Sequence, residues 1–117
     1  MVKSQLLDRT FAALSDPTRR DILEQLSAGP ASISELARPS GISLPGVMKH
    51  VRVLEAASLV TTEKHGRVRQ CRLGPGGMDD ATRWIESHRR QWERRLDRLE
   101  TIVARKTRPA MRKGDLP

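Results

Sequence analysis

The chain has 117 residues, the size of one domain with a modest core. Its 22 Lys and Arg residues outnumber 14 Asp and Glu residues, and the formal net charge of +8 indicates an anionic partner, with nucleic acid favoured over a membrane surface. The single cysteine, Cys71, excludes an intramolecular disulfide and favours a reducing compartment. No signal-peptide pattern follows Met1 and no apolar run approaches roughly 18 residues, so we expect a cytoplasmic protein without a membrane partner.

The first part of the chain has helical periodicity. Leu7, Phe11 and Leu14 recur at steps of four and three, which predicts a helix over residues 3–15. Asp16 is a good N-cap and the proline after it suits a first helical turn. A second helix is therefore predicted, which ends at the next Gly-Pro pair.

Two further helices are predicted around a tight turn. Ser32 and Glu35 have the spacing of a capping box, which begins the third helix. Gly41 supplies the turn and Ser43 is the N-cap of a fourth helix over residues 43–54. A helix, a tight turn and a second helix form a helix-turn-helix, whose second helix enters the DNA major groove.

The rest of the chain predicts a hairpin and a long helix. Residues 59–64 and 67–73 read as paired strands around a His65-Gly66 turn. A long helix follows over residues 79–106. The predicted fold is a mainly α winged helix-turn-helix with five helices and a two-stranded β-hairpin wing. It occupies residues 1–106, and the basic tail over residues 107–117 is expected to be disordered.

The fourth helix and the hairpin are the candidate DNA interface. Residues 43–73 carry six bases and two acids, a net charge of +4. The residues expected nearest the bases are Ser43, Leu44, Pro45, Gly46 and Met48; those expected on phosphates are Lys49, His50 and Arg52; and those expected on flanking backbone or minor groove are Lys64, His65 and Arg67. The structural alternatives are an ordinary helix pair and an edge hairpin kept soluble by its charges.

Several motifs together resemble a known family. The stretches LSDPTRRDILEQL, SISELA, GISLPGVMKHVRVLEAASLV and GRVRQCRL are similar to the ArsR/SmtB-type winged-helix repressors, over roughly residues 6–103. The last helix is similar to the branch that lacks the sensory metal motif. The resemblance implies a homodimeric transcriptional repressor that binds operator DNA through residues 43–54. The similarity to that branch further implies that the protein regulates its own gene. It also implies a dimer interface formed by the first and last helices, with Leu7, Phe11, Trp84, Ile85, His88, Trp92, Leu96 and Leu99.

Two positions on the expected DNA face depart from the family. Leu44 stands where a polar residue is frequent, and Met48 stands where serine is frequent. Apolar side chains there are suited to thymine methyl groups, or they indicate an unusual operator. The sequence leaves both interpretations open.

Metal and thiol chemistry have little support in the sequence. The family's thiolate site needs cysteines in the third helix, which has none, and His88 with the acids of the last helix does not supply three or four converging ligands. We therefore expect no metal and no cofactor. Cys71 is interpreted as a small buried hydrophobe, with a redox switch as the alternative.

Other functions remain as alternatives. No catalytic grouping is present, so we expect no enzyme activity. A non-specific architectural DNA-binding protein would share the basic charge. A protein-interaction module would use Leu44, Met48 and Val53 on the same helix. The operator sequence, any small-molecule effector and the role of the tail are left open.

Overall fold

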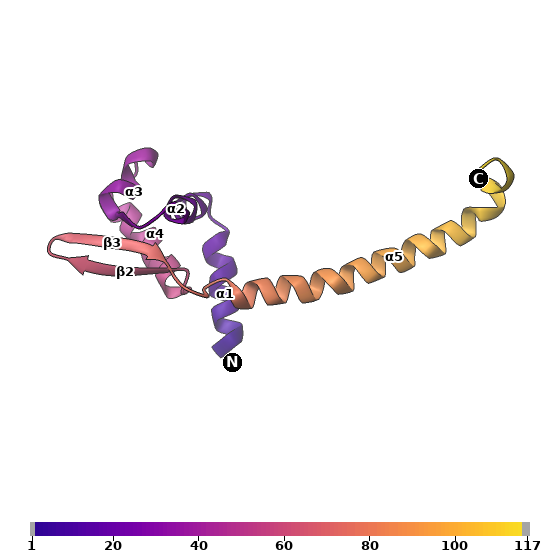
Figure 1. Cartoon of the computed structure of the whole chain (residues 1–117), viewed down its shortest axis with the longest axis horizontal. Coiled ribbons are helices and arrows are strands. Elements are labelled where there is room, and N and C mark those ends of the chain that lie inside the picture. The colour runs from indigo at the N-terminus through magenta and orange to yellow at the C-terminus, as the bar shows by residue number, and fades with distance from the viewer. Residues whose placement is uncertain (1, 116–117) are drawn as a thin grey trace. The chain divides into compact units, whose positions relative to one another are not determined.

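The computed structural model describes the backbone of residues 2–115 and the side chains of residues 5–106. The chain divides into two compact units, Met1–Thr82 and Arg83–Pro117. The elements, labelled in Figure 1, are α1 (Val2–Leu14), α2 (Pro17–Ser27), β1 (Ala31–Ser32), α3 (Ile33–Ser40), α4 (Leu44–Ala56), β2 (Val60–His65), β3 (Val68–Leu73) and α5 (Asp79–Asp115). The predicted class, a mainly α winged helix, is confirmed, with five helices in the described part of the chain.

Local side chains begin the helices as the sequence predicts. The Asp16 carboxylate accepts the backbone N–H of Arg19 at 3.0 Å, at the start of α2. Ser32 and Glu35 form the capping box of α3: the Ser32 hydroxyl accepts the Glu35 amide at 3.1 Å, and the Glu35 carboxylate accepts the Ser32 amide at 2.8 Å. Ser43 is the N-cap of α4. These caps satisfy amides that have no partner within their helices.

The sheet has a third strand that the sequence did not predict. Its order is β1-β3-β2 and both pairings are antiparallel. Ala31 pairs with Cys71, and Ser32 pairs with Gln70. Two residues are too short to show an alternating pattern, so only the tertiary packing defines this strand. Because Ser32 also caps α3, the base of the wing is tied to the start of the helix-turn-helix.

The turn of the wing lies one residue later than predicted. His65 is the last residue of β2 and pairs with Val68, so the two-residue loop is Gly66-Arg67 rather than His65-Gly66. Gly66 has a φ of +65°, a conformation that glycine adopts at little cost. In this register Gly66 is the first residue of the two-residue loop, a position at which the favoured hairpin turns have a positive φ.

The core of the first unit is aliphatic. Its buried side chains come from α2, α3, α4, the turn after α4 and the two long strands: Ile22, Leu23, Leu26, Leu36, Ala37, Val47, Val51, Leu54, Ala57, Leu59, Val60 and Cys71. On α1 the buried residues are Thr10 and Ala13, whereas Leu7, Phe11 and Leu14 are half-buried. On α4 the buried residues are Val47, Val51 and Leu54, which lie on one face of the helix.

The second unit is the greater part of α5. The helix continues to Asp115, past its predicted end near Lys106. The side chains of residues 107–117 lie outside the described residues, so the division into a domain and a tail stays a prediction. No helix in the described part of the chain is both long and apolar enough to cross a membrane.

Candidate nucleic-acid interface

The outward face of α4 consists of two neighbouring rows of side chains. Val47, Val51 and Leu54 hold the opposite face in the core, with at most 1% of each side chain exposed. Residues four apart lie above one another on a helix, so the outward rows are Leu44, Met48 and Arg52, and beside them Pro45, Lys49 and Val53. Met48 is half-buried, and the other five residues are exposed. Most of the residues predicted near the bases and phosphates therefore share one face.

The start of α4 is built from small residues for a packing reason. The Ser43 hydroxyl accepts the amide of Gly46 at 3.2 Å. A Cβ added at Gly46 would lie 2.7 Å from Cγ2 of Ile42, closer than Cβ atoms approach other atoms. The sequence places Gly46 among the residues expected nearest the bases. The structure shows that the turn before α4 already requires it.

His50 lies apart from the other residues predicted to contact phosphates. Its ring is half-buried and its Nδ1 lies 3.3 Å from Nη1 of Arg19, at the start of α2, and 3.9 Å from Oδ2 of Asp16. Lys49 and Arg52 remain on the outward face. His50 therefore contacts the first turn of α2 rather than sharing the surface of Lys49 and Arg52.

Arg19 is a residue whose role sequence reasoning missed. Its Nε donates to the carbonyl of Ala13 at 2.9 Å and its Nη2 donates to the carbonyl of Ala12 at 3.1 Å. Its guanidinium thus joins the end of α1, the start of α2 and the recognition helix. The Asp-Pro-Thr-Arg-Arg run contained the signal, but only tertiary packing shows which arginine reaches the histidine.

The contacts at the start of α2 lower the pKa of the Asp16 carboxyl group. The amide of Arg19 donates to its carboxylate and, as the largest cause, holds the pKa of Asp16 below its usual value. Desolvation opposes this effect, and the positive charge of Arg19 adds to it. The first turn of α2 therefore favours the ionised carboxylate.

The wing carries the predicted bases at its tip. Lys64, His65 and Arg67 are exposed. The Nε2 atom of His65 lies 2.9 Å from Oε2 of Glu63, and the same carboxylate oxygen lies 3.6 Å from Nη2 of Arg72. Glu63 therefore engages His65, and the loop residue Arg67 is the base farthest toward the end of the hairpin.

A chain of hydrogen bonds joins the recognition helix to the wing. Arg69 on β3 donates from Nη1 to the Thr62 hydroxyl at 2.9 Å, and that hydroxyl donates to Oε2 of Glu55 on α4, also at 2.9 Å. Nothing in the sequence pattern indicated this contact, because the three residues come from three elements. It links the two parts of the predicted DNA interface.

Cys71 is fully buried in the middle of β3. Desolvation raises the pKa of its thiol, the charge of Glu55 adds to that rise, and Arg69 opposes it. A reactive thiolate needs exposure and a lowered pKa, so the geometry agrees with a small buried hydrophobe.

The part of the chain with described side chains holds no group of three or more His, Cys, Asp or Glu residues placed to bind a metal ion. His88, on α5, stacks on Trp84 with ring centroids 4.1 Å apart, and its Nδ1 lies 2.9 Å from the Trp84 carbonyl oxygen. These contacts are local to one helical turn and account for the position of the ring.

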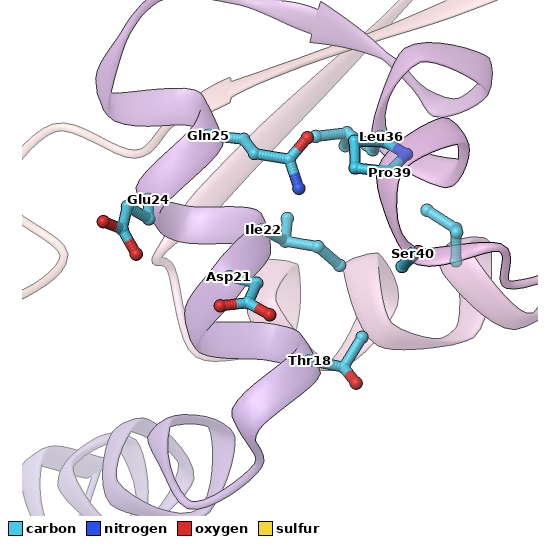
Figure 2. A pocket seen from close by; sticks show the side chains of 9 residues that line it. Thr18, Asp21, Ile22, Glu24, Gln25, Leu36, Pro39 and Ser40 are labelled. Carbon is cyan, nitrogen blue, oxygen red and sulfur yellow. The ribbon is translucent and has the colours of Figure 1, made fainter.

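A cavity of about 300 Å³ lies between α2, α3 and α4, behind the outward face of the recognition helix. Figure 2 shows the side chain of Ile22 on α2 pointing into the space between α2 and α3. Leu36 and Val47 also line it. The sequence could not indicate this cavity, because its lining comes from three helices.

In the second unit, α5 exposes an apolar stripe at steps of three and four residues. Its members with large exposed side chains are Trp84, Ile85, Trp92, Leu96, Leu99, Ile102 and Val103. Trp92 is 65% exposed in the single chain. The remaining predicted interface residues, Leu7 and Phe11, belong to the first unit and are half-buried there.

The first unit is a winged helix-turn-helix, a class of fold that docks on DNA. A helix-turn-helix domain family matches residues 14–63. The HTH-type transcriptional regulator Rv2034 of Mycobacterium tuberculosis is 44% identical over 71 residues, which cover 61% of this chain and 66% of that protein. The transcriptional repressor SdpR of Bacillus subtilis is 29% identical over 79 residues, which cover 68% of this chain and 88% of that protein.

A solved structure extends the match. The crystal structure of an ArsR family transcriptional regulator is similar with a TM-score of 0.72 and 41% identity, over 77% of this chain and 93% of that one. The chain therefore belongs to the ArsR family of transcriptional regulators. The predicted resemblance and the predicted class, a DNA-binding regulator, are confirmed. The individual DNA-contacting residues and the dimer interface stay predictions.

Proposed function

We propose that this protein is a homodimeric repressor that binds a specific operator through α4 and the wing and regulates its own gene. The observation that carries the proposal is the outward face of α4. The opposite face of α4 is buried in the core, and the outward face exposes Lys49 and Arg52 to solvent. The uncharged residues Leu44 and Met48 lie beside them. Lys64 and Arg67 supply further positive charge at the wing. Such an arrangement suits base contacts in the major groove flanked by phosphate contacts.

The apolar stripe of α5 supports the dimer. Large apolar side chains that follow a helical seam in water are usually covered by a partner, and a second copy of α5 offers a matching stripe. A dimer places two copies of α4 on one duplex. The half-sites are then expected about 10 base pairs apart or at a multiple of that spacing.

Repression needs no second activity in this proposal. A dimer bound over a promoter blocks polymerase by occupying the DNA. The similarity to the repressor SdpR supports this direction of regulation. We expect the protein to act in the cytoplasm, without a catalytic function and without a metal or other cofactor.

Fluorescence anisotropy of the full chain on DNA from upstream of its own gene tests the proposal. A scrambled duplex is the control, and the salt concentration is varied. We expect affinity on the order of 10³-fold or more above the scrambled duplex. Equal affinity for both duplexes with a steep salt dependence would support the architectural alternative. Absence of binding to either duplex would support the protein-interaction module instead.

A further inference from the structure

The N-terminal end of α4 offers DNA almost no hydrogen-bonding side chain. Leu44, Pro45, Gly46 and Met48 carry none by their chemistry. The one polar side chain at this end, Ser43, has its oxygen engaged by the Gly46 amide at 3.2 Å. Recognition by paired hydrogen bonds from arginine, asparagine or glutamine is therefore excluded at these positions.

The same end presents an apolar surface. Leu44 is 51% exposed, and Met48 lies one turn further along the same row, half-buried. Arg52 follows in that row and Lys49 stands beside it, both exposed. Leu44 and Met48 thus form an apolar surface next to the positive charges of Lys49 and Arg52. This surface matches a partner whose apolar groups lie next to anionic groups. The major groove of DNA has this pattern, with base edges between two phosphate backbones.

The major-groove edges of the four bases carry one apolar group, the C5 methyl of thymine. We infer that Leu44 and Met48 select an operator half-site by contact with thymine C5 methyl groups. This inference rests on the proposed function and names what the start of α4 reads. It decides between the two interpretations that the sequence left open.

Removal of the methyl groups one at a time tests the inference. The operator is first obtained by selection from a random duplex library with the full chain. Each thymine of the half-site is then replaced by deoxyuridine, which removes the methyl and keeps the hydrogen-bonding edge. Loss of one buried methyl corresponds to about fourfold weaker binding. We expect that loss at one or more positions in each half-site and none at thymines outside the half-sites.

Variants assign the effect to the side chains. Leu44→Ala removes an exposed side chain at the first turn, where alanine is well tolerated in a helix. We expect it to reduce the difference between thymine and uracil duplexes at the position that Leu44 contacts, because the methyl then loses most of its apolar partner. Met78→Ala is the matched control, since Met78 is an exposed apolar residue outside α4 and the wing, and it should keep the wild-type ratio.

The outcomes separate this inference from the proposed function. A selected operator whose binding is unchanged by every uracil replacement would overturn the role of Leu44 and Met48 and leave the sequence-specific regulator standing. An unchanged thymine-to-uracil ratio in Leu44→Ala would overturn it as well. Failure of the selection to yield any preferred sequence would contradict both.

Discussion

Arg19 and His50 join the start of α2 to the middle of the recognition helix, with 3.3 Å between Nη1 and Nδ1. Arginine can only donate, so this hydrogen bond requires an unprotonated Nδ1 on His50. Asp16 lies 3.9 Å from the same nitrogen and accepts the Arg19 amide. The orientation of α4 therefore depends on a residue that contacts the helix from the side of the core, away from Lys49 and Arg52.

The first prediction concerns the geometry of the Arg19 guanidinium. Its three nitrogen atoms reach the Ala13 carbonyl, the Ala12 carbonyl and His50. Lysine keeps the charge but cannot make these three contacts at once. We expect Arg19→Lys to lower the free energy of unfolding by about 1–3 kcal/mol, measured by urea denaturation.

Arg20 provides the matched control for that experiment. It is exposed and makes one hydrogen bond, from Nη1 to the Leu14 carbonyl at 2.7 Å. Arg20→Lys is expected to change the free energy of unfolding by less than about 0.5 kcal/mol. Equal effects of the two substitutions would refute a special role for Arg19.

The second prediction concerns acid stability. Backbone hydrogen bonds lower the folded-state pKa of Asp16, at the start of α2, and of Glu35, in the capping box of α3. A carboxyl with a lowered folded pKa stabilises the fold above its unfolded pKa, and that stabilisation is lost as the pH falls through the folded pKa. We therefore expect the free energy of unfolding to decrease as the pH drops below about 4.

A double variant isolates this contribution. Asp16→Asn with Glu35→Gln keeps residues that can act as N-cap and capping-box partners but do not titrate. Its free energy of unfolding should fall less steeply below pH 4 than that of the wild-type chain, as followed by urea denaturation at several pH values. The neutral-pH values of the two proteins serve as the reference. Identical slopes would show that the caps do not contribute to acid unfolding.

These caps also show what the sequence could predict. Asp16, Ser32 and Ser43 each accept the backbone amide of the residue three positions later. Because this contact is local, the sequence alone predicted the three helix starts. Strand β1 depends on pairing with β3, almost forty positions away, and the sequence did not predict it. The sequence predicts His50 on phosphates beside Lys49 and Arg52, whereas its ring lies against Arg19 of α2. Long-range contacts account for both differences.

The third prediction concerns the wing. Arg67 occupies the loop of the hairpin and is exposed, so we expect it to contact a phosphate or the minor groove. Arg67→Ala should weaken binding to all duplexes and reduce the slope of log affinity against log salt by about one unit. Fluorescence anisotropy at several salt concentrations measures this slope.

Arg89→Ala is the control for that loss of charge. Arg89 lies on α5 and is paired with Glu86 at 3.2 Å and with Glu93 at 3.8 Å. Its substitution removes the same net charge from a residue that is not part of the wing, and the salt slope should stay at the wild-type value. An Arg67→Ala slope equal to that of the wild-type protein would remove Arg67 from the DNA contacts.

The fourth prediction concerns the stripe of α5. Trp92 is 65% exposed in the single chain, so its removal costs the isolated protomer little. If a second copy buries it, Trp92→Ala should weaken the dimer by on the order of 3 kcal/mol, the cost of deleting a buried large side chain. Sedimentation equilibrium over a range of concentrations should show a shift toward monomer. Arg90→Ala, on the opposite side of the helix, should leave the association unchanged. A Trp92→Ala protein that stays as dimeric as the wild type would mean that another surface holds the two copies together.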